Sequence, residues 1–262
     1  MAIIVEGRLM AFLLLAVSLG LFYAMMYMGK RGGVVKVRAL PAMEAIPEAV
    51  GRAAEMGKSV FYTTGVGGLS ISNASQGPQT LASISIMEYA ARMSAKNGVR
   101  LDLFTPIPDA LPLMEETLRN AYELEGSTVD FNADMIHFVP EYDPYVAGCL
   151  GYLQRERPAS TLLIGSFASE AVILGEAGNT IGALQIGGTA QTGQIPFLVA
   201  TCDYVLISEE LYAASASISQ NPDILGSLKG EDFVKFGIVA VIIVGVLLAL
   251  TGSRALVNIL KV

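Results

Sequence analysis

The residues best suited to chemistry in this sequence lie in three loops, and each loop follows a stretch that is predicted to be a β-strand. The first loop has the sequence TTGVGGLSISN, the second covers residues 165–170, and the third covers residues 187–194. Glycine, hydroxyl and amide groups in such loops can bind a ligand or lie close against a neighbouring protein. The candidate ligand-binding or partner-contact residues are Thr64, Gly65, Gly67, Gly68, Ser70, Gly165, Ser166, Glu170, Gly187, Gly188, Thr189, Gln191 and Gln194.

The first loop departs from the glycine motif of dinucleotide-binding domains. That motif, G-x-G-x-x-G, places its last glycine inside a helix, where the helix amides meet the pyrophosphate. Here the glycines follow the pattern G-x-G-G, the helix starts only after Gln76-Gly77-Pro78, and the loop contains no Gly-Lys-Ser/Thr. The spacing therefore disfavours a dinucleotide. Two alternatives stay open: a surface loop packed over the sheet, and a contact loop for a partner or an unusual ligand.

No set of side chains in the sequence completes a catalytic centre. Ser166 lacks the G-x-S-x-G surroundings of a nucleophile elbow, and the lone histidine, His137, lies on another predicted strand. We interpret Ser166 as a helix N-cap and His137 as a satisfied core residue. Adjacent Glu209 and Glu210 diverge by about 100° on a helix, which favours helix-start charges over acid–base catalysis. We predict no catalytic residue; Glu170 and Glu209 are the acids to test if the protein is an enzyme.

Composition argues against metal, cofactor and nucleic-acid chemistry. The chain has one histidine and two cysteines, Cys149 and Cys202, which are far apart in the sequence and show no paired metal spacing. Residues 39–232 carry nine Lys and Arg against 23 Asp and Glu, a net charge of −14. Such an acidic surface repels nucleic acid. We therefore predict no metal, no cofactor and no nucleic-acid partner.

Two apolar stretches predict transmembrane helices. Residues 9–28 contain no charged side chain, and residues 233–251 contain one, Lys235. Twenty apolar residues are enough to cross a bilayer. Basic residues cluster directly after the first stretch, in the sequence KRGGVVKVR, which favours a cytoplasmic central domain with both termini outside. A buried core helix is the alternative for either stretch, and a cleaved signal peptide is a further alternative for the first.

Between these stretches, short apolar runs alternate with longer segments of helical periodicity. The predicted strands cover residues 59–64, 99–105, 135–139, 160–164, 180–186 and 204–207, and the predicted helices cover residues 79–97, 108–124, 144–157, 167–177 and 209–219. This alternation predicts an α/β domain with a doubly wound, Rossmann-like, mostly parallel sheet of five to six strands, flanked by N- and C-terminal transmembrane helices. In such sheets ligands bind at the carboxyl ends of the strands, where the three loops lie.

The predicted domain organisation follows from the same pattern. It comprises a short N-terminal tail (1–8), a transmembrane helix (9–28), a basic juxtamembrane linker with a short helix (29–58), the Rossmann-like domain (59–219), a linker (220–232), a second transmembrane helix (233–251) and a C-terminal tail (252–262).

Several blocks of sequence resemble a known family. They are VFYTTGVGGL, QTLASISIM, LLIGSFASEAVILGEAGN, IGALQIGGTAQTGQIPFLVATCDYVLISEELYAASA and LGSLKGED. With these blocks the chain resembles a prokaryotic membrane-protein family that has a cytoplasmic α/β domain of unknown function between two transmembrane helices. The resemblance implies that the spans and the domain belong together, and that the polar segments near the first, fourth and fifth strands form the family's distinctive surface. It brings no activity.

These observations favour a non-enzymatic role. We expect a two-span protein of the cell membrane, in contact with membrane lipid, whose cytoplasmic α/β domain anchors or organises a larger assembly as a homo-oligomer or with other protein subunits. The alternative is a membrane-anchored sensor of a small-molecule or nucleotide-like ligand that uses the three loops. An enzyme of unrecognised type and a transporter are less favoured.

Overall fold

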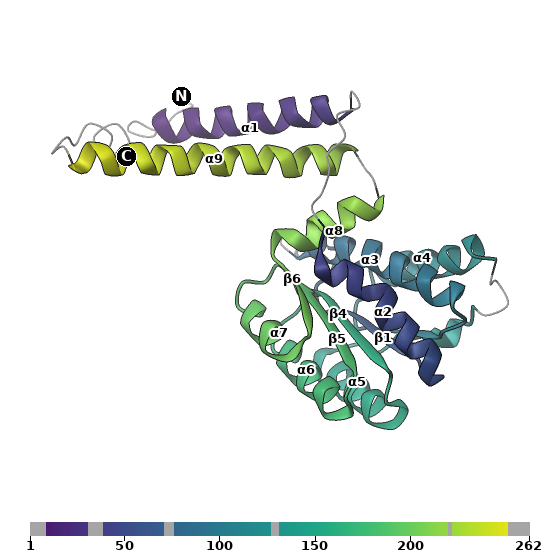
Figure 1. Ribbon diagram of the computed structural model, residues 1–262. Coiled ribbons are helices and arrows are strands. Elements are labelled where there is room, and N and C mark those ends of the chain that lie inside the picture. Colours follow the sequence, from purple (N-terminus) through teal and green to yellow (C-terminus); the bar gives the residue numbers. More distant parts are fainter. Residues whose placement is uncertain (1–8, 31–38, 71–75, 127–130, 220–221, 251–262) are drawn as a thin grey trace. The chain divides into compact units, whose positions relative to one another are not determined.

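The computed structural model describes residues 9–30, 39–70, 76–126, 131–219 and 222–250. The chain divides into two compact units. One unit comprises residues 1–37 and 220–262, and the other comprises residues 38–219. Figure 1 shows that the first unit is a pair of helices and that the second is an α/β domain.

The α/β unit is built on one six-stranded sheet. Every pair of neighbouring strands is parallel, and the order is β3-β2-β1-β4-β5-β6. The predicted Rossmann-like parallel sheet is therefore confirmed. The strand order reverses between β1 and β4, which is where doubly wound folds place a ligand. The strands are β1 (Val60–Gly65), β2 (Leu101–Thr105), β3 (Ile136–Phe138), β4 (Ser160–Ser166), β5 (Leu184–Thr189) and β6 (Tyr204–Ile207).

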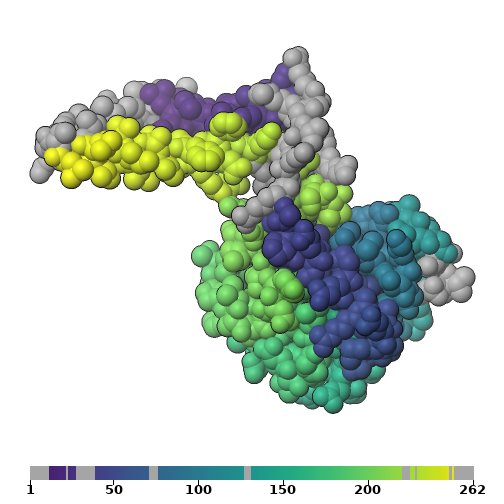
Figure 2. Space-filling view, viewed as in Figure 1, coloured from purple at the N-terminus to yellow at the C-terminus, as the bar shows by residue number. Residues whose placement is uncertain are grey.

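Helices cover both faces of the sheet. On one face α3 packs against α2, α4 and α8, and on the other face α6 packs against α5 and α7 (Figure 1). In the view of Figure 2, α2 lies across the front of the unit as a dark blue band. The helices are α2 (Pro41–Met56), α3 (Gly77–Lys96), α4 (Leu111–Leu124), α5 (Tyr142–Glu156), α6 (Glu170–Ile181), α7 (Ile195–Thr201) and α8 (Glu209–Ser219), with a 3-10 turn at Ala133–Met135.

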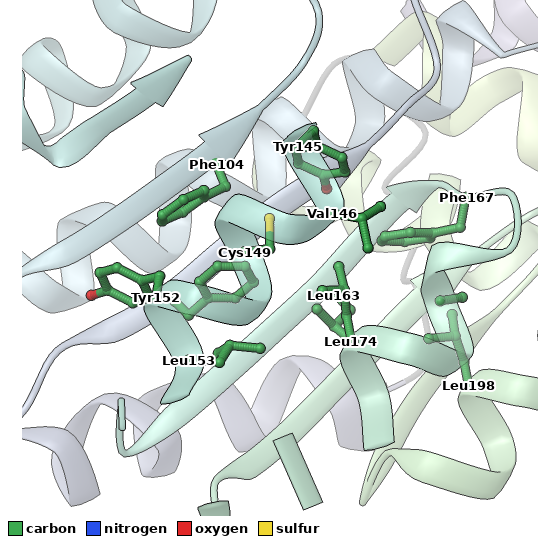
Figure 3. Packing of buried hydrophobic residues seen from close by; sticks show 12 residues of the cluster. Phe104, Tyr145, Val146, Cys149, Tyr152, Leu153, Leu163, Phe167, Leu174 and Leu198 are labelled. Carbon is green, nitrogen blue, oxygen red and sulfur yellow. The ribbon is translucent and has the colours of Figure 1, made fainter. Parts of the chain in front are cut away.

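One hydrophobic cluster of the core lies beneath α5 and α6. All residues of the central strands β1, β2 and β4 are buried, as expected for a parallel sheet with helices on both faces. Figure 3 shows Phe104 and Leu163 of the sheet packed against Cys149 and Leu153 of α5 and Leu174 of α6. This packing fixes where each strand ends, and so it also fixes the loops that follow.

The other unit consists of α1 (Leu9–Lys30) and α9 (Pro222–Leu250), which lie side by side (Figure 1). A Cβ atom at Gly226 would lie 2.9 Å from the carbonyl oxygen of Met25, so the two helix backbones touch there. Residues 222–232, which the sequence analysis assigns to a linker, are the first turns of α9. Within the described part of the chain, no helix combines the length and the apolar character needed to cross a membrane.

Some predicted boundaries in the α/β unit are wrong. The predicted helix over residues 167–177 stops before Gly178, but α6 continues to Ile181, and Gly182 with φ of 72° ends it. A Cβ atom at Gly178 would collide with the side chain of Gln185, so this glycine makes room for a neighbour instead of ending the helix. One helix, α7, is absent from the predicted helices, and the short helix predicted within residues 29–58 is present as α2, which belongs to the α/β unit.

Candidate functional site

The candidate site is the carboxyl edge of the sheet around the switch point between β1 and β4. Here the two strand ends touch each other. The pairing of β1 with β4 is in register up to Thr63 and then shifts, so that Gly65 pairs with Ser166. The amide of Val66 donates a hydrogen bond of 2.8 Å to the carbonyl of Ser166. Main chain from both strand ends therefore meets at the switch point of the sheet, where doubly wound folds place a ligand.

Glycine makes this close approach feasible. A Cβ atom at Gly65 would lie under 3.0 Å from the Ser166 carbonyl, and one at Gly165 would lie equally close to the Thr64 carbonyl. Both glycines also have a positive φ, 72° at Gly65 and 150° at Gly165, which side chains disfavour. A Cβ atom at Gly67 would meet the Ser166 side chain in the same way. These glycines serve contact between two loops of the same chain.

The second and third loops also meet through side chains. The Gln191 amide donates to Ser166 Oγ at 3.2 Å, which joins the third loop to the second. Gln79 of α3 accepts a hydrogen bond of 3.0 Å from the Ala190 amide. Thr189, which is fully buried, accepts one of 3.2 Å from the Gln191 amide. The structure thus brings these parts of the loops together, and their polar groups are largely used in bonds to one another.

Two of the candidate glycines have no access to a ligand. Gly187 and Gly188 lie within β5, and both are buried. A Cβ atom at Gly187 would lie 2.9 Å from Sγ of Cys202, and one at Gly188 would lie 3.2 Å from Cβ of Leu206. Their role is close packing of the strand against α7 and β6.

Ser166 does not cap α6, contrary to the sequence interpretation. It ends β4, while Ser169 precedes the helix and Glu170 is its first residue. Glu170 is fully buried, and its Oε2 accepts a hydrogen bond of 2.9 Å from the Ala168 amide. Burial raises the pKa of Glu170 above its usual value, although the hydrogen bonds oppose this. Glu170 therefore stabilises the turn into α6.

Four buried oxygen atoms at this edge have no hydrogen-bond partner among the described residues. They belong to Thr64 at the end of β1, to Tyr142 at the start of α5, to Glu170 through its Oε1, and to Gln194 at the start of α7. They come from four different elements. Their unmet hydrogen bonds mark this region as less completely satisfied than the rest of the core.

A cavity of about 450 Å³ lies at the carboxyl ends of β1 and β2. Gly68 and Ser70 line it from the first loop, residues 106–109 from the loop after β2, and Tyr142 from α5. Asp109 Oδ2 accepts a hydrogen bond of 3.0 Å from the Leu69 amide and so ties the two loops together. The volume is within the usual range of small-molecule sites. The second and third candidate loops do not line this cavity.

The acids and thiols outside the three loops have structural roles. Glu210 Oε2 accepts a hydrogen bond of 3.1 Å from the Ile207 amide, consistent with the predicted role at a helix start. Burial raises the pKa of Cys202 to about 12 and raises that of Cys149 as well, so both thiols stay protonated. Among the residues that the structure describes, no group of His, Cys, Asp and Glu is arranged to hold a metal ion.

A second polar cluster lies at the opposite, amino edge of the sheet, and the sequence analysis missed it. Asp102, only 1% exposed, accepts hydrogen bonds from Arg100 Nε at 2.9 Å, His137 Nε2 at 3.1 Å and the Tyr152 hydroxyl at 2.5 Å. Ser59 in turn donates to Tyr152 at 2.7 Å. The His137 side chain is therefore hydrogen-bonded to a buried carboxylate, and it is not an ordinary core histidine. A carboxylate between two leucines in the strand VRLDLFT was the available signal.

Electrostatics keep Asp102 ionised. Burial alone would raise its pKa, but the hydrogen bonds from His137, Tyr152 and Arg100, with the charge of Arg100, outweigh burial and lower it. Burial and the adjacent Asp102 raise the pKa of Tyr152, so its hydroxyl remains a donor. The cluster is thus a fixed anion surrounded by donors.

One protein-family profile matches residues 1–260, which span both structural units. The chain belongs to that family, DUF6754. DUF6754 is described as a domain of unknown function, in agreement with the family of unknown function that the sequence resembles. The DUF6754 match joins the helix pair and the α/β unit in one family. No curated protein and no solved structure matches the chain.

Proposed function

We propose that this DUF6754 protein is a non-enzymatic subunit that anchors or organises a larger membrane-associated assembly. The outer surface of α6 and α7 carries the proposal. The sequence of α7, IPFLVAT, is apolar throughout, yet only Leu198 and Thr201 are buried. A helix that is apolar on all sides is normally covered on all sides.

The exposed apolar residues of α6 and α7 belong to two helices in contact. Phe197 is 43% exposed and Val199 is 53% exposed, and Val172 and Ile173 of α6 are exposed as well. We call these four residues the α6–α7 face. The helices meet closely, because a Cβ atom at Gly175 of α6 would collide with the Thr201 side chain of α7. Exposed apolar side chains on two helices in contact support a surface for protein contact.

The candidate loops support this role by fixing the two helices. The second loop leads directly into α6 through Glu170, and the third leads into α7 through Gln194. The bond between Gln191 and Ser166 holds the two loops together. The two loops therefore hold the contact surface of α6 and α7 in place. This reduces the entropy that is lost when a partner binds.

Membrane attachment is part of the proposal, and its support comes from the sequence. Residues 9–28 contain no charged side chain, and the basic residues that follow favour a cytoplasmic α/β unit with both termini outside. The start of α9 touches the end of α1 at Gly226, so the helices form an antiparallel pair. In this account the helix pair contacts membrane lipid, and the α/β unit contacts protein.

The test is a mass determination on the full chain after gentle extraction in mild detergent. We expect a defined particle larger than one chain, either a homo-oligomer or a complex with other subunits. The double variant Phe197→Ser/Val199→Ser should shift the mass to a smaller species. Leu124→Ser, at a site on α4 that is 66% exposed, is the matched control and should leave the mass unchanged. A monomer at every concentration, with no co-purifying protein, would contradict the proposal.

A second candidate function is a sensor of a small ligand, and the 450 Å³ cavity favours it. The site would differ from the predicted one, because Gly68, Ser70 and Tyr142 line it while Gly165 and Gln191 do not. Nucleotides, acyl carriers and common metabolites can be screened by thermal unfolding of the full chain. A ligand that raises Tm in the wild type but not in Tyr142→Ala would support the sensor. The absence of any shift would count against it.

A further inference from the structure

The amino edge of the sheet holds a polar cavity with a volume of about 710 Å³. It opens between the ends of α2, α3 and α5 and the beginnings of the strands. None of the sequence-predicted candidate residues lines it. The polar residues that line it are Lys58, Ser59, Asn97, Arg100, Asp102, His137, Tyr152, Arg155 and Glu156.

The cavity has a rigid polar wall. The His137 ring is stacked on Phe104 at 4.3 Å between centroids, and its Nε2 lies 3.1 Å from Asp102. An ionised carboxylate only accepts hydrogen bonds, so Nε2 carries a proton, and in the neutral ring Nδ1 is then an acceptor. Nδ1 has no partner among the described residues, and the His137 side chain is 31% exposed. The ring therefore presents a fixed acceptor at the cavity.

Asp102 fits a supporting role better than a purely structural one. It stands between Leu101 and Leu103, both fully buried, where an apolar residue would avoid the cost of burying a charge. A buried carboxylate that orients a histidine at a cavity is a common way to prepare a binding group.

Cations gather at this cavity although the domain is acidic. Three of the eight Lys and Arg in residues 39–219 line it: Lys58, Arg100 and Arg155. Arg100 is already paired with Asp102. Lys58 and Arg155 have no ion pair among the described residues. The acidic Glu156 also lines the cavity.

We propose that this cavity binds a small organic anion that carries a hydroxyl group. Lys58 and Arg155 hold its carboxylate or phosphate, and His137 Nδ1 accepts a hydrogen bond from its hydroxyl.

The cations also have an explanation that involves no ligand. The helices α2, α3 and α5 all end at this edge, and basic residues there interact favourably with helix dipoles. The two explanations predict different responses to added anions.

The test uses thermal unfolding of the full chain in mild detergent with four probes: malate, succinate, glycerol 3-phosphate and inorganic phosphate. Malate and succinate differ only by the hydroxyl, as glycerol 3-phosphate and phosphate differ by the glycerol part. We expect malate or glycerol 3-phosphate, at about ten times its Kd, to raise Tm by roughly 3–6 °C. The partner that lacks the hydroxyl should bind more weakly.

Variants then locate the site. Lys58→Met and Arg155→Met should each weaken the affinity about tenfold. His137→Phe should remove the preference for the hydroxylated probe while leaving part of the binding to its charge. Arg119→Met, at an exposed ion pair within α4, is the matched control and should bind as the wild type does.

Two results would overturn the proposal. One is that no probe raises Tm in the wild type, and the other is that Lys58→Met and Arg155→Met bind the probes unchanged. Calorimetric titration of the same variants gives the affinity directly, so a variant with a lowered Tm still reports on binding. Neither result depends on whether the protein is part of a larger assembly. The proposal for the α6–α7 face is therefore tested independently of this one.

Discussion

The two edges of the sheet in this DUF6754 protein have different roles from those that their sequences indicate. At the carboxyl edge the glycine- and serine-rich loops resemble a ligand site, yet Gly65 and Gly165 serve to bring β1 and β4 into backbone contact. At the amino edge the sequence is unremarkable, yet Asp102 and His137 form a charged cluster beside a 710 Å³ cavity. A glycine-rich loop indicates that another group lies close to the loop backbone. That group can be another segment of the same chain.

The largest expected effect tests whether the carboxyl edge is closed. Gly165→Ala places a Cβ atom against the Thr64 carbonyl at a residue with φ of 150°. We expect a loss of about 3 kcal/mol or more in the free energy of unfolding, measured by chemical denaturation. Gly51→Ala, in α2 with open space around it, is the control and should stabilise the protein slightly. A loss below about 1 kcal/mol for Gly165→Ala would mean that the strand ends lie apart.

The next effect concerns the amino edge. Asp102→Asn removes the charge that accepts hydrogen bonds from Arg100, His137 and Tyr152, and we expect a loss of about 2 kcal/mol at neutral pH. Because folding lowers the pKa of Asp102, its contribution is present above the unfolded-state pKa of about 3.9 and disappears as the pH falls through the lower folded value. The variant should therefore lose less stability than the wild type on acidification. Equal acid sensitivity of the two proteins would show that Asp102 does not anchor the cluster.

The smallest effect has the opposite sign and sharpens the contrast between the edges. Folding raises the pKa of Glu170, so its ionised form opposes folding once the pH exceeds the unfolded-state pKa of about 4.3. Glu170→Gln keeps an acceptor for the Ala168 amide and removes this charge. We expect a gain of up to about 1 kcal/mol at neutral pH and little change in acid. A variant that is less stable than the wild type at neutral pH would show that the charge is needed.

The fold was predictable because its signals are local. The alternation of short apolar runs with helical segments gives the parallel sheet, and turn residues such as Asn97-Gly98 mark most boundaries within a few positions. The prediction was wrong where a distant contact decides the outcome. Gly178 continues α6 because Gln185 needs its space, and α7 forms from a run too short to show helical periodicity.

The candidate sites depended still more on distant contacts. The loops were found from their composition, but their closure depends on a shift in strand register that no local pattern reveals. The Asp102 cluster joins residues that lie 35 and 50 positions apart in the sequence. The local signal was the carboxylate of Asp102 between Leu101 and Leu103, because a buried charge needs a partner.

The central claim is that the α6–α7 face contacts another polypeptide, and photo-cross-linking in the native membrane tests it most directly. A photoreactive side chain would replace Val199, which is 53% exposed, and in a control it would replace Leu124 on α4. The account predicts one defined protein adduct from position 199 and no such adduct from position 124. If position 199 gives no adduct, or gives only the products that position 124 gives, the face is free and the proposed assembly role is contradicted.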